Sequence, residues 1–272
     1  MEVSEAKDLV NIVFGDFNLS AVEYDFTCEK HGDYRGRKFK SPRTGLITDP
    51  KCPVCEADAE RERVAAEQRE ARQQFLIRSI ERAGIPKRFQ SKRLTDFKPS
   101  RPDQQHALSV CNEYAENFED AIHAGRCMIF CGKAGTGKTH LSTAIANHVI
   151  LGGRTAIFSS VREIVGAVKA TWRKGSPKTE QEALEPFAKV DLLVIDEVGV
   201  QFDTEAEKLV MFDVINRRYN DMKPMIVISN LPMESADGQS IRSVLGDRII
   251  DRLRENGGKL IKFEWDSHRG AA

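Results

Sequence analysis

The stretch CMIFCGKAGTGKTH, residues 127–140, decides the fold of this chain. Its first five residues form an apolar run, and residues 132–139 then match the pattern G-x4-G-K-T. The next residues, LSTAIANHVI, have helical periodicity, so the motif lies between a strand and a helix, the context that makes it specific. We therefore predict a phosphate-binding loop in an α/β domain with a central parallel sheet flanked by helices.

Each part of this loop has a role at the phosphates of ATP or ADP. The glycines let backbone N–H groups curl around the phosphates, and the N-terminus of the following helix adds a favourable dipole. Lys138 is expected to reach the β- and γ-phosphates, and Thr139 to place its hydroxyl on Mg²⁺. The predicted nucleotide-binding residues are Gly132, Lys133, Ala134, Gly135, Thr136, Gly137, Lys138, Thr139 and His140.

Two carboxylates end a second apolar run, VDLLVIDEVG, residues 190–199. Such a run is typical of a strand buried on both faces of a parallel sheet. Asp196 is expected to hold Mg²⁺, directly or through water, and Glu197 to polarise an attacking water, which favours a hydrolase over a small-molecule kinase. The alternative for Glu197 is a surface acid. A further strand, RTAIFSS, lies between the two motifs, as in RecA-like and AAA+ ATPases.

Downstream, the strand-like PMIVISNLP makes Asn230 a candidate sensor of the γ-phosphate, with an ordinary turn residue as the alternative. In LGDRIIDRLRENG, Arg248 and Arg252 are four apart on one helical face. Because Lys138 already serves the chain's own site, such an arginine is a candidate finger for a neighbouring subunit's ATP. A solvated basic helix is the alternative. The last strand, in GKLIKFEWDSHRG, leaves little sequence for a C-terminal helical lid.

The N-terminal part carries two pairs of potential metal ligands. Cys28 and His31 form a C-x2-H pair, and Cys52 and Cys55 form a C-x2-C pair. Two such pairs make a tetrahedral zinc site, and metal binding would supply folding energy to a segment with little core. Four protein ligands leave no open position, so the predicted Zn²⁺ is structural. Unrelated surface residues, or a redox C-x2-C, are the alternatives.

After Cys55 the chain consists of strong helix formers as far as Gly84. This helix is either a solvated connection or a docking surface for a partner. The proline-rich GIPKRFQSKRLTDFKPSRPDQ that follows is interpreted as a linker. The predicted domains are a zinc-binding head at residues 1–58, a helical connector at 59–84 and the ATPase domain at 85–272.

Bulk properties exclude some classes of protein. The net charge is zero, so any contact with nucleic acid must be local. No stretch approaches the roughly 20 apolar residues of a membrane span, and the acidic N-terminus is no signal peptide. We therefore expect a cytoplasmic protein whose cysteines are metal ligands or buried thiols rather than disulfides. The expected buried thiols are Cys111, Cys127 and Cys131.

The segments GKAGTGKTH, VDLLVIDEVGVQ, LGDRIIDRLR and WDSHR, in this order, resemble the DnaC family of helicase loaders. The resemblance extends over residues 72–270. It implies an AAA+ module without a lid, preceded by an N-terminal extension that grips the hexameric replicative DNA helicase. It also implies ATP-dependent loading of that helicase onto single-stranded DNA in replication initiation, with self-association side by side in the complex. The Cys/His head is not universal in this family.

Further residue roles come from the resemblance alone. It makes Arg252 the preferred finger, with Arg248 second, and makes Arg269 a candidate second sensor at the nucleotide. Single-strand binding falls on VREIVGAVKATWRKG, residues 161–175, where Trp172 would stack a base and Arg173 and Lys174 would meet phosphates. A packed core position is the alternative for Trp172.

Two other functions remain open at this point. An IstB-type AAA+ ATPase that assists a transposase has a similar ATPase core, so the motifs do not separate it from a loader. A zinc-containing DNA-binding regulator with a degenerate ATPase is the third class. The intact Lys138, Asp196 and Glu197 argue against that class.

Overall fold

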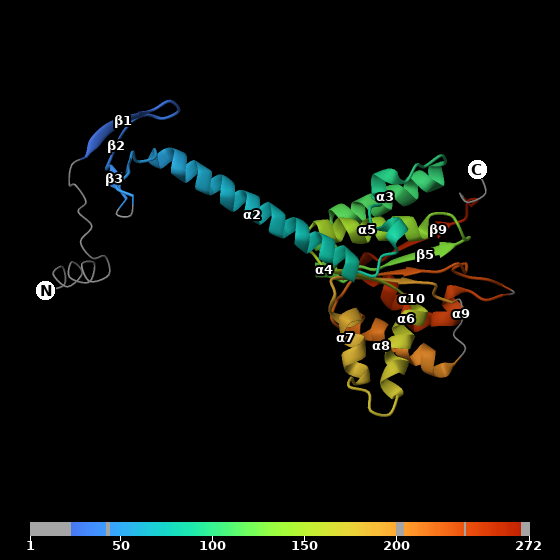
Figure 1. Cartoon of the computed structure of the whole chain (residues 1–272). Coiled ribbons are helices and arrows are strands. Elements are labelled where there is room, and N and C mark those ends of the chain that lie inside the picture. Colours follow the sequence, from blue (N-terminus) through green and yellow to red (C-terminus); the bar gives the residue numbers. More distant parts are fainter. Residues whose placement is uncertain (1–22, 42–43, 200–203, 237, 268–272) are drawn as a thin grey trace. The chain divides into compact units, whose positions relative to one another are not determined.

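The computed structural model describes residues 23–41, 44–199, 204–236 and 238–267. The chain divides into two compact units, residues 1–73 and 74–272. The first unit carries the Cys/His cluster and the second carries the phosphate loop. Figure 1 shows the helices and strands of each unit. Among the described residues, no helix is both long enough and apolar enough to cross a bilayer.

The first unit consists of two small hairpins and the beginning of a long helix. Its elements are β1 (Tyr24–Cys28), β2 (Gly32–Gly36), β3 (Phe39–Lys40), β4 (Ile47–Thr48) and α2 (Pro53–Arg82). β1 pairs with β2 and β3 with β4, both antiparallel. The rings of Phe26 and Tyr34 stack 5.6 Å apart, and the Tyr34 hydroxyl donates to the Pro50 carbonyl at 2.6 Å. This small apolar contact contributes little stability by itself, which is consistent with the predicted contribution of a metal to folding.

Helix α2 is continuous for 30 residues and starts at Pro53, so Cys55 lies on the helix itself rather than before it. Proline is favourable in the first turn because its missing N–H has no helical partner there. Exposed ion pairs such as Arg63 with Glu67 contribute only a few tenths of a kcal/mol each. Within the second unit, Leu76 and Ile80 pack against the ATPase core. The apolar second half of the helix is therefore partly a core element.

The second unit is built on a five-stranded sheet with the order β6-β7-β8-β5-β9. All its neighbours pair in parallel. Its strands are β5 (Met128–Gly132), β6 (Ala156–Ser160), β7 (Leu192–Asp196), β8 (Met225–Ile228) and β9 (Lys259–Phe263). β6 follows β5 in the chain but lies at the edge of the sheet, with β7 and β8 between them. Because β6 also comes between β5 and β7 along the chain, the prediction that the phosphate-loop strand and the acidic strand are not sequential neighbours is confirmed.

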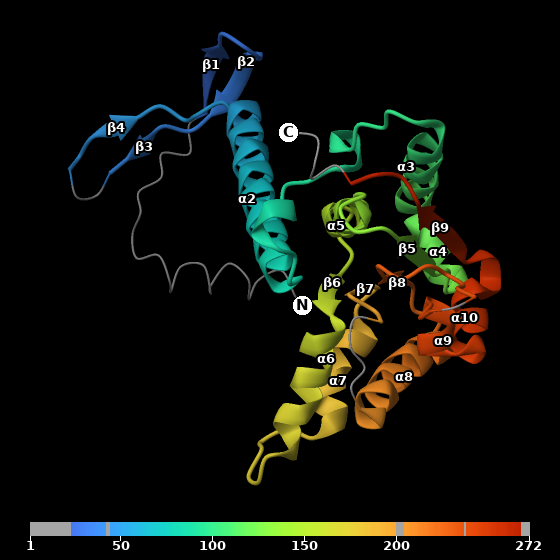
Figure 2. The ribbon, with the colours of Figure 1, turned by 90° about the vertical axis from the view of Figure 1, so that its right-hand side faces the viewer.

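Helices cover both faces of this sheet. They are α3 (Pro102–Glu116), α4 (Phe118–Ala124), α5 (Lys138–Leu151), α6 (Val161–Lys169), α7 (Glu180–Lys189), α8 (Glu205–Asn220), α9 (Ile241–Leu245) and α10 (Asp247–Arg254). Alternate residues of β5 face opposite sides: Phe130 packs in the core beneath α5, and Ile129 packs in the core with α6 and α8. Figure 2 shows α5 on one side of the strands and α6, α7 and α8 on the other. The predicted α/β class with a flanked parallel sheet is confirmed.

Arg218 of α8 is a fully buried charged residue that no sequence pattern predicted. Burial lowers the pKa of its guanidinium to about 10, so it stays charged at neutral pH. It donates to five backbone carbonyls, those of Phe187, Ala188, Val190, Asp191 and Pro224. These carbonyls precede β7 and β8, so one side chain joins the end of α7 to the starts of two central strands.

The segment after Gly84 is not the spacer that its prolines indicated. It forms two short 3-10 turns, η1 (Lys87–Phe89) and η2 (Leu94–Asp96). Ile85, Leu94 and Phe97 are buried. Asn147 of α5 donates to the carbonyls of Phe89 and Lys92 at 2.9 and 2.8 Å. Proline ends a helix but does not prevent packing, so the linker interpretation was wrong. Cys111, Cys127 and Cys131 are buried, as predicted for core thiols.

Candidate functional site

The predicted phosphate loop connects β5 to α5, and its lysine is held inside it. The Lys138 side chain is 5% exposed, and its ammonium donates to the carbonyls of Gly132 and Lys133 at 2.7 and 2.6 Å. Gly132 has φ +120°, and a Cβ there would lie 2.4 Å from the Phe263 carbonyl oxygen. Gly137 has φ +101°, and a Cβ there would lie 2.7 Å from the Phe97 ring. Only glycine fits these two positions.

The two side chains predicted to bind Mg²⁺ lie together although they are 57 residues apart in the chain. The Thr139 hydroxyl donates to Asp196 Oδ2 at 3.1 Å. Neighbouring ligands of an octahedral Mg²⁺ with bonds of about 2.0–2.1 Å are separated by about 2.9 Å, so this spacing suits the ion. Burial raises the pKa of the Asp196 carboxyl, and hydrogen bonds from Glu197 N–H and Thr139 offset part of that rise. A cation here would favour the ionised carboxylate.

Glu197 follows in a strained backbone conformation. Its φ is +63°, in the left-handed region that costs a residue with a side chain on the order of 1 kcal/mol. The turn is fixed by the next residue, because Val198 N–H donates to the Ile228 carbonyl at 2.9 Å and Ser229 Oγ donates to the Val198 carbonyl at 2.5 Å. Strain that the surrounding structure maintains is characteristic of functional sites. The Glu197 side chain is exposed and lines the cavity described next.

A cavity of about 540 Å³ unites most of the predicted nucleotide residues. Those that line it are Ala134, Gly135, Gly137, Lys138, Thr139, His140, Asp196, Glu197 and Asn230. Gly132 and Lys133 instead line a neighbouring hollow with Asn230, and Thr136 is buried beneath the loop. The structure therefore gathers both motifs and Asn230 at one edge of the sheet.

The remaining wall of this cavity was missed from the sequence. It comes from the segment interpreted as a linker: Arg88, Phe89, Asp96, Phe97 and Lys98. The ring of His140 lies 6.4 Å from that of Phe89 and 6.0 Å from that of Phe97. Two aromatic rings and two cations suit a nucleotide's base and charge. The alternation of Phe with Arg and Lys in residues 87–98 was the only available signal.

The two candidate finger arginines lie on α10, and neither is among the residues lining that cavity. The Arg252 guanidinium stacks over the Tyr219 ring at 4.7 Å, and the Tyr219 hydroxyl donates to Glu255 at 2.6 Å. Arg248 is exposed. Both arginines line a separate open hollow. Arg252 thus packs on α8 whereas Arg248 does not, and the finger role of either arginine stays a prediction.

The predicted single-strand residues are on the surface. Trp172 is 50% exposed, and its indole N–H donates to Glu180 at 2.6 Å. Arg173 and Lys174 are exposed beside it. The packed-core alternative for Trp172 is therefore wrong. Arg269, the candidate second sensor, lies outside the described residues.

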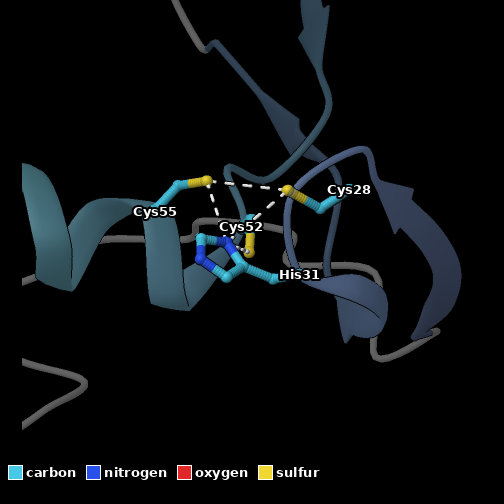
Figure 3. Close-up of side chains that lie close together, drawn as sticks. All are labelled: Cys28, His31, Cys52 and Cys55. Atoms are coloured by element: carbon cyan, nitrogen blue, oxygen red, sulfur yellow. Dashed lines mark hydrogen bonds between the residues drawn. The ribbon is translucent and has the colours of Figure 1, made fainter.

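The four predicted metal ligands converge, as Figure 3 shows. The three sulfurs and His31 Nδ1 all lie within 4.8 Å of one another. The Cys28 and Cys55 sulfurs are 3.6 Å apart, and His31 Nδ1 is 3.3 Å from the Cys55 sulfur. A tetrahedral zinc with bonds of about 2.3 Å to sulfur and 2.0 Å to nitrogen separates its ligands by about 3.5–3.8 Å. The cluster fits such an ion.

The thiols of this cluster differ in acidity: the hydrogen bond with Cys28 raises the pKa of the Cys55 thiol to about 11. The backbone amides of Lys30 and His31 are the main cause that lowers the pKa of the Cys28 thiol to about 6, which favours the thiolate that a metal requires. His31 Nε2 lies 3.4 Å from Asp58 Oδ2, so this carboxylate of α2 can orient the ring that presents Nδ1 to the sulfurs. The Asp58 contact was not anticipated, because it depends on α2 beginning at Pro53.

Replacing Cys52 by serine is expected to abolish zinc binding and unfold the hairpins of the first unit. Removing one of four ligands lowers the affinity for the metal, and with it the free energy that metal binding contributes to folding. Zinc per mole of purified protein, measured by atomic absorption, should fall from about one to near zero. Cys111→Ala, which removes a buried thiol from the second unit, is the matched control and should keep its zinc. Wild-type protein without stoichiometric zinc would contradict the assignment.

Comparison with known proteins agrees with this geometry. The sequence profile of the family described as IstB-like ATP binding protein matches residues 61–270. The replicative helicase loader DnaC of Escherichia coli K12 is 35% identical over 207 residues, 76% of this chain and 81% of the relative. The protein of the same name from Buchnera aphidicola of Acyrthosiphon pisum is 34% identical over 74% of this chain and 78% of its own.

Solved structures show the same fold. The crystal structure of the DnaC helicase loader matches 65% of this chain and 99% of its own, with a TM-score of 0.56 and 23% identity. AMPPCP-bound DnaA from Aquifex aeolicus matches 67% of this chain and 52% of its own, with a TM-score of 0.52 and 28% identity. The predicted AAA+ fold and ATPase class are confirmed. This chain belongs to the family of IstB-like ATP binding proteins, as one of its DnaC-like AAA+ ATPases.

Proposed function

We propose that this chain is an ATP-dependent loader that binds the replicative ring helicase and places it on single-stranded DNA during replication initiation. The observation that carries the proposal is the 35% identity to the replicative helicase loader DnaC across 81% of that relative. The hydrolytic residues Lys138, Asp196 and Glu197 line one cavity, which supports a working ATPase over a degenerate one.

In this proposal the cavity binds ATP with Mg²⁺ and hydrolyses it. Lys138 faces the β- and γ-phosphates, while Thr139 and Asp196 hold the ion that neutralises phosphate charge. Glu197, at the exposed mouth of the site, orients the attacking water and accepts its proton. Asn230 follows β8 at the same edge and would hydrogen-bond the γ-phosphate. Its hydrogen bonding would therefore differ between the ATP-bound and the ADP-bound site.

The first unit is the proposed grip on the helicase. The family profile begins at residue 61, after the Cys/His cluster, so this part is not accounted for by the shared ATPase fold. The cluster leaves no open position for chemistry, and large apolar side chains nearby are exposed: Leu46 at 63%, Ile47 at 62% and Val54 at 48%. A unit with exposed large apolar side chains suits recognition of a protein partner.

Single-stranded DNA is the proposed nucleic acid. A solved structure of the initiator DnaA bound to AMPPCP and single-stranded DNA matches 67% of this chain and 51% of its own, at 26% identity and a TM-score of 0.54. Here the exposed Trp172 offers a stacking face beside Arg173 and Lys174. Aromatic stacking with adjacent cations binds single strands without strong sequence preference.

Arg252→Ala is expected to keep ATP affinity while lowering ATP turnover in the assembled loader–helicase complex by about 10³-fold, because a finger stabilises transition-state charge in a neighbouring site. Turnover of the complex is the measurement, with Arg248→Ala as the comparison variant. Normal turnover in Arg252→Ala, with loss in Arg248→Ala, would move the role to Arg248. Normal turnover in both variants would contradict the proposal that an arginine of α10 is the finger.

The function itself is tested by affinity capture of the tagged full-length protein from host cells, with ATP and then ADP, and identification of bound proteins by mass spectrometry. We expect the replicative helicase, and its loss in Cys52→Ser. Recovery of a transposase, with ATP-dependent filaments on duplex DNA, would instead favour the IstB-type helper and overturn the loader.

A further inference from the structure

The residues after β9 form an aromatic column beneath the phosphate loop. Trp265 is 2% exposed, and its ring lies 4.8 Å from that of Phe263, which in turn lies 5.3 Å from Phe130 of β5. Phe263 and Phe130 are likewise buried in the core next to α5. The column therefore holds the Trp265 ring in place, and the indole N–H is the one polar group that this packing does not account for.

That polar edge binds the loop. The Trp265 indole N–H donates to the Thr136 carbonyl at 2.9 Å, and both groups are buried. The Thr136 hydroxyl donates to the Lys133 carbonyl at 2.8 Å, and Lys133 N–H donates to the Phe263 carbonyl at 2.9 Å. The loop is thus tied at two points to the segment 263–265, and Trp265 and Thr136 are 129 residues apart in the chain.

The hydrogen bond to Thr136 decides the orientation of one peptide group. In a trans peptide the C=O and the following N–H point in opposite directions. Since Trp265 holds the Thr136 C=O on the buried side, Gly137 N–H is directed to the opposite side, where Gly137 lines the nucleotide cavity. Gly137 has φ +101°, a conformation in which glycine also tolerates the flipped peptide.

We propose that Trp265 is a positioning residue for nucleotide binding, which holds the Thr136–Gly137 peptide so that its N–H faces the phosphates. Without the indole donor, the Thr136 carbonyl is left buried and unsatisfied, and the peptide is free to flip. The loop then presents an oxygen to the phosphates in place of an N–H. The exposed pair of Lys133 with Asp266, at 3.5 Å, is a weak second tie.

This inference rests on nucleotide binding by the phosphate loop. The test is Trp265→Phe in the full-length protein, which keeps the aromatic column and removes the donor. We expect the Kd for ADP·Mg²⁺, measured by calorimetry, to rise about ten-fold, the loss for one buried hydrogen bond of about 1.4 kcal/mol. The KM for ATP should rise similarly while kcat changes little, because the lost contact is present in ground and transition states alike.

Tyr114→Phe is the matched control. Tyr114 is 4% exposed and its hydroxyl donates to the Arg126 carbonyl at 2.9 Å, so the substitution also removes one buried donor from a backbone carbonyl. It should lower the Tm comparably and leave the Kd unchanged. Equal Kd values for Trp265→Phe and wild type would overturn the proposal and make Trp265 a core residue only. Absence of binding by the wild type would instead overturn the phosphate-loop assignment.

Discussion

Lys138→Ala is expected to weaken nucleotide binding by at least about 100-fold, the largest effect of any single substitution in the second unit. Its ammonium is buried in the loop and bonded to the carbonyls of Gly132 and Lys133, and the residue lines the cavity. Alanine removes the only charge that this loop directs at the β- and γ-phosphates, and truncating one partner of a buried charge pair costs several kcal/mol. Calorimetric titration with ADP·Mg²⁺ and ATP measures the loss.

The control for this substitution is Lys208→Ala, which removes an exposed lysine of α8 that pairs with Glu205. Its nucleotide affinity should equal that of the wild type, since exposed pairs contribute little. Far-UV circular dichroism should be unchanged in both variants. Wild-type affinity in folded Lys138→Ala protein would refute the phosphate-loop assignment.

Glu197→Gln is expected to lower ATP turnover by about 10²-fold or more while leaving ATP affinity within about two-fold. Glutamine keeps the size and the polar surface of glutamate but does not accept a proton from the attacking water. Because the side chain is exposed, the substitution creates no buried unpaired group and should not change the Tm. Steady-state phosphate release and calorimetry, performed on the same preparation, separate turnover from binding.

Glu205→Gln is the matched control, an exposed carboxylate at the start of α8 whose loss should not change turnover. Unchanged turnover in Glu197→Gln would return Glu197 to a surface acid at the end of a strand. A wild-type protein that binds ATP but shows the turnover of Glu197→Gln would instead favour the regulator with a degenerate ATPase.

The sequence by itself determined the features that local pattern controls. Apolar runs of four or five residues became the buried strands β5, β7 and β8, because a strand covered on both faces has no polar side to alternate. The glycine pattern at 132–137 predicted the loop, since positive φ and close backbone approach exclude other residues. The spacing within each Cys/His pair predicted a cluster, because two tight turns of this kind converge on one ion.

Other features were decided only by the tertiary structure. Residues 84–104 contain three prolines and mixed charge, which locally resemble a linker. Yet residues 84–98 pack on α5 and supply one wall of the cavity. The buried Arg218 and the bond from Trp265 to the phosphate loop join segments far apart in the chain, and no periodicity encodes such pairs. The two tryptophans differ in the same way: Trp172 is 50% exposed and Trp265 is 2% exposed, and the sequence around each does not predict this difference.

The physical reason for this division is the distance along the chain over which each kind of interaction acts. Strand, helix and turn preferences act over a few neighbouring residues and are readable as patterns along the chain. The burial of a particular tryptophan, or the hydrogen-bond partner of a particular carbonyl, depends on which surfaces the folded sheet brings together. For this protein the sequence predicted the ATPase class and the Cys/His cluster, and the fold of the sheet determined which distant residues surround the phosphate loop.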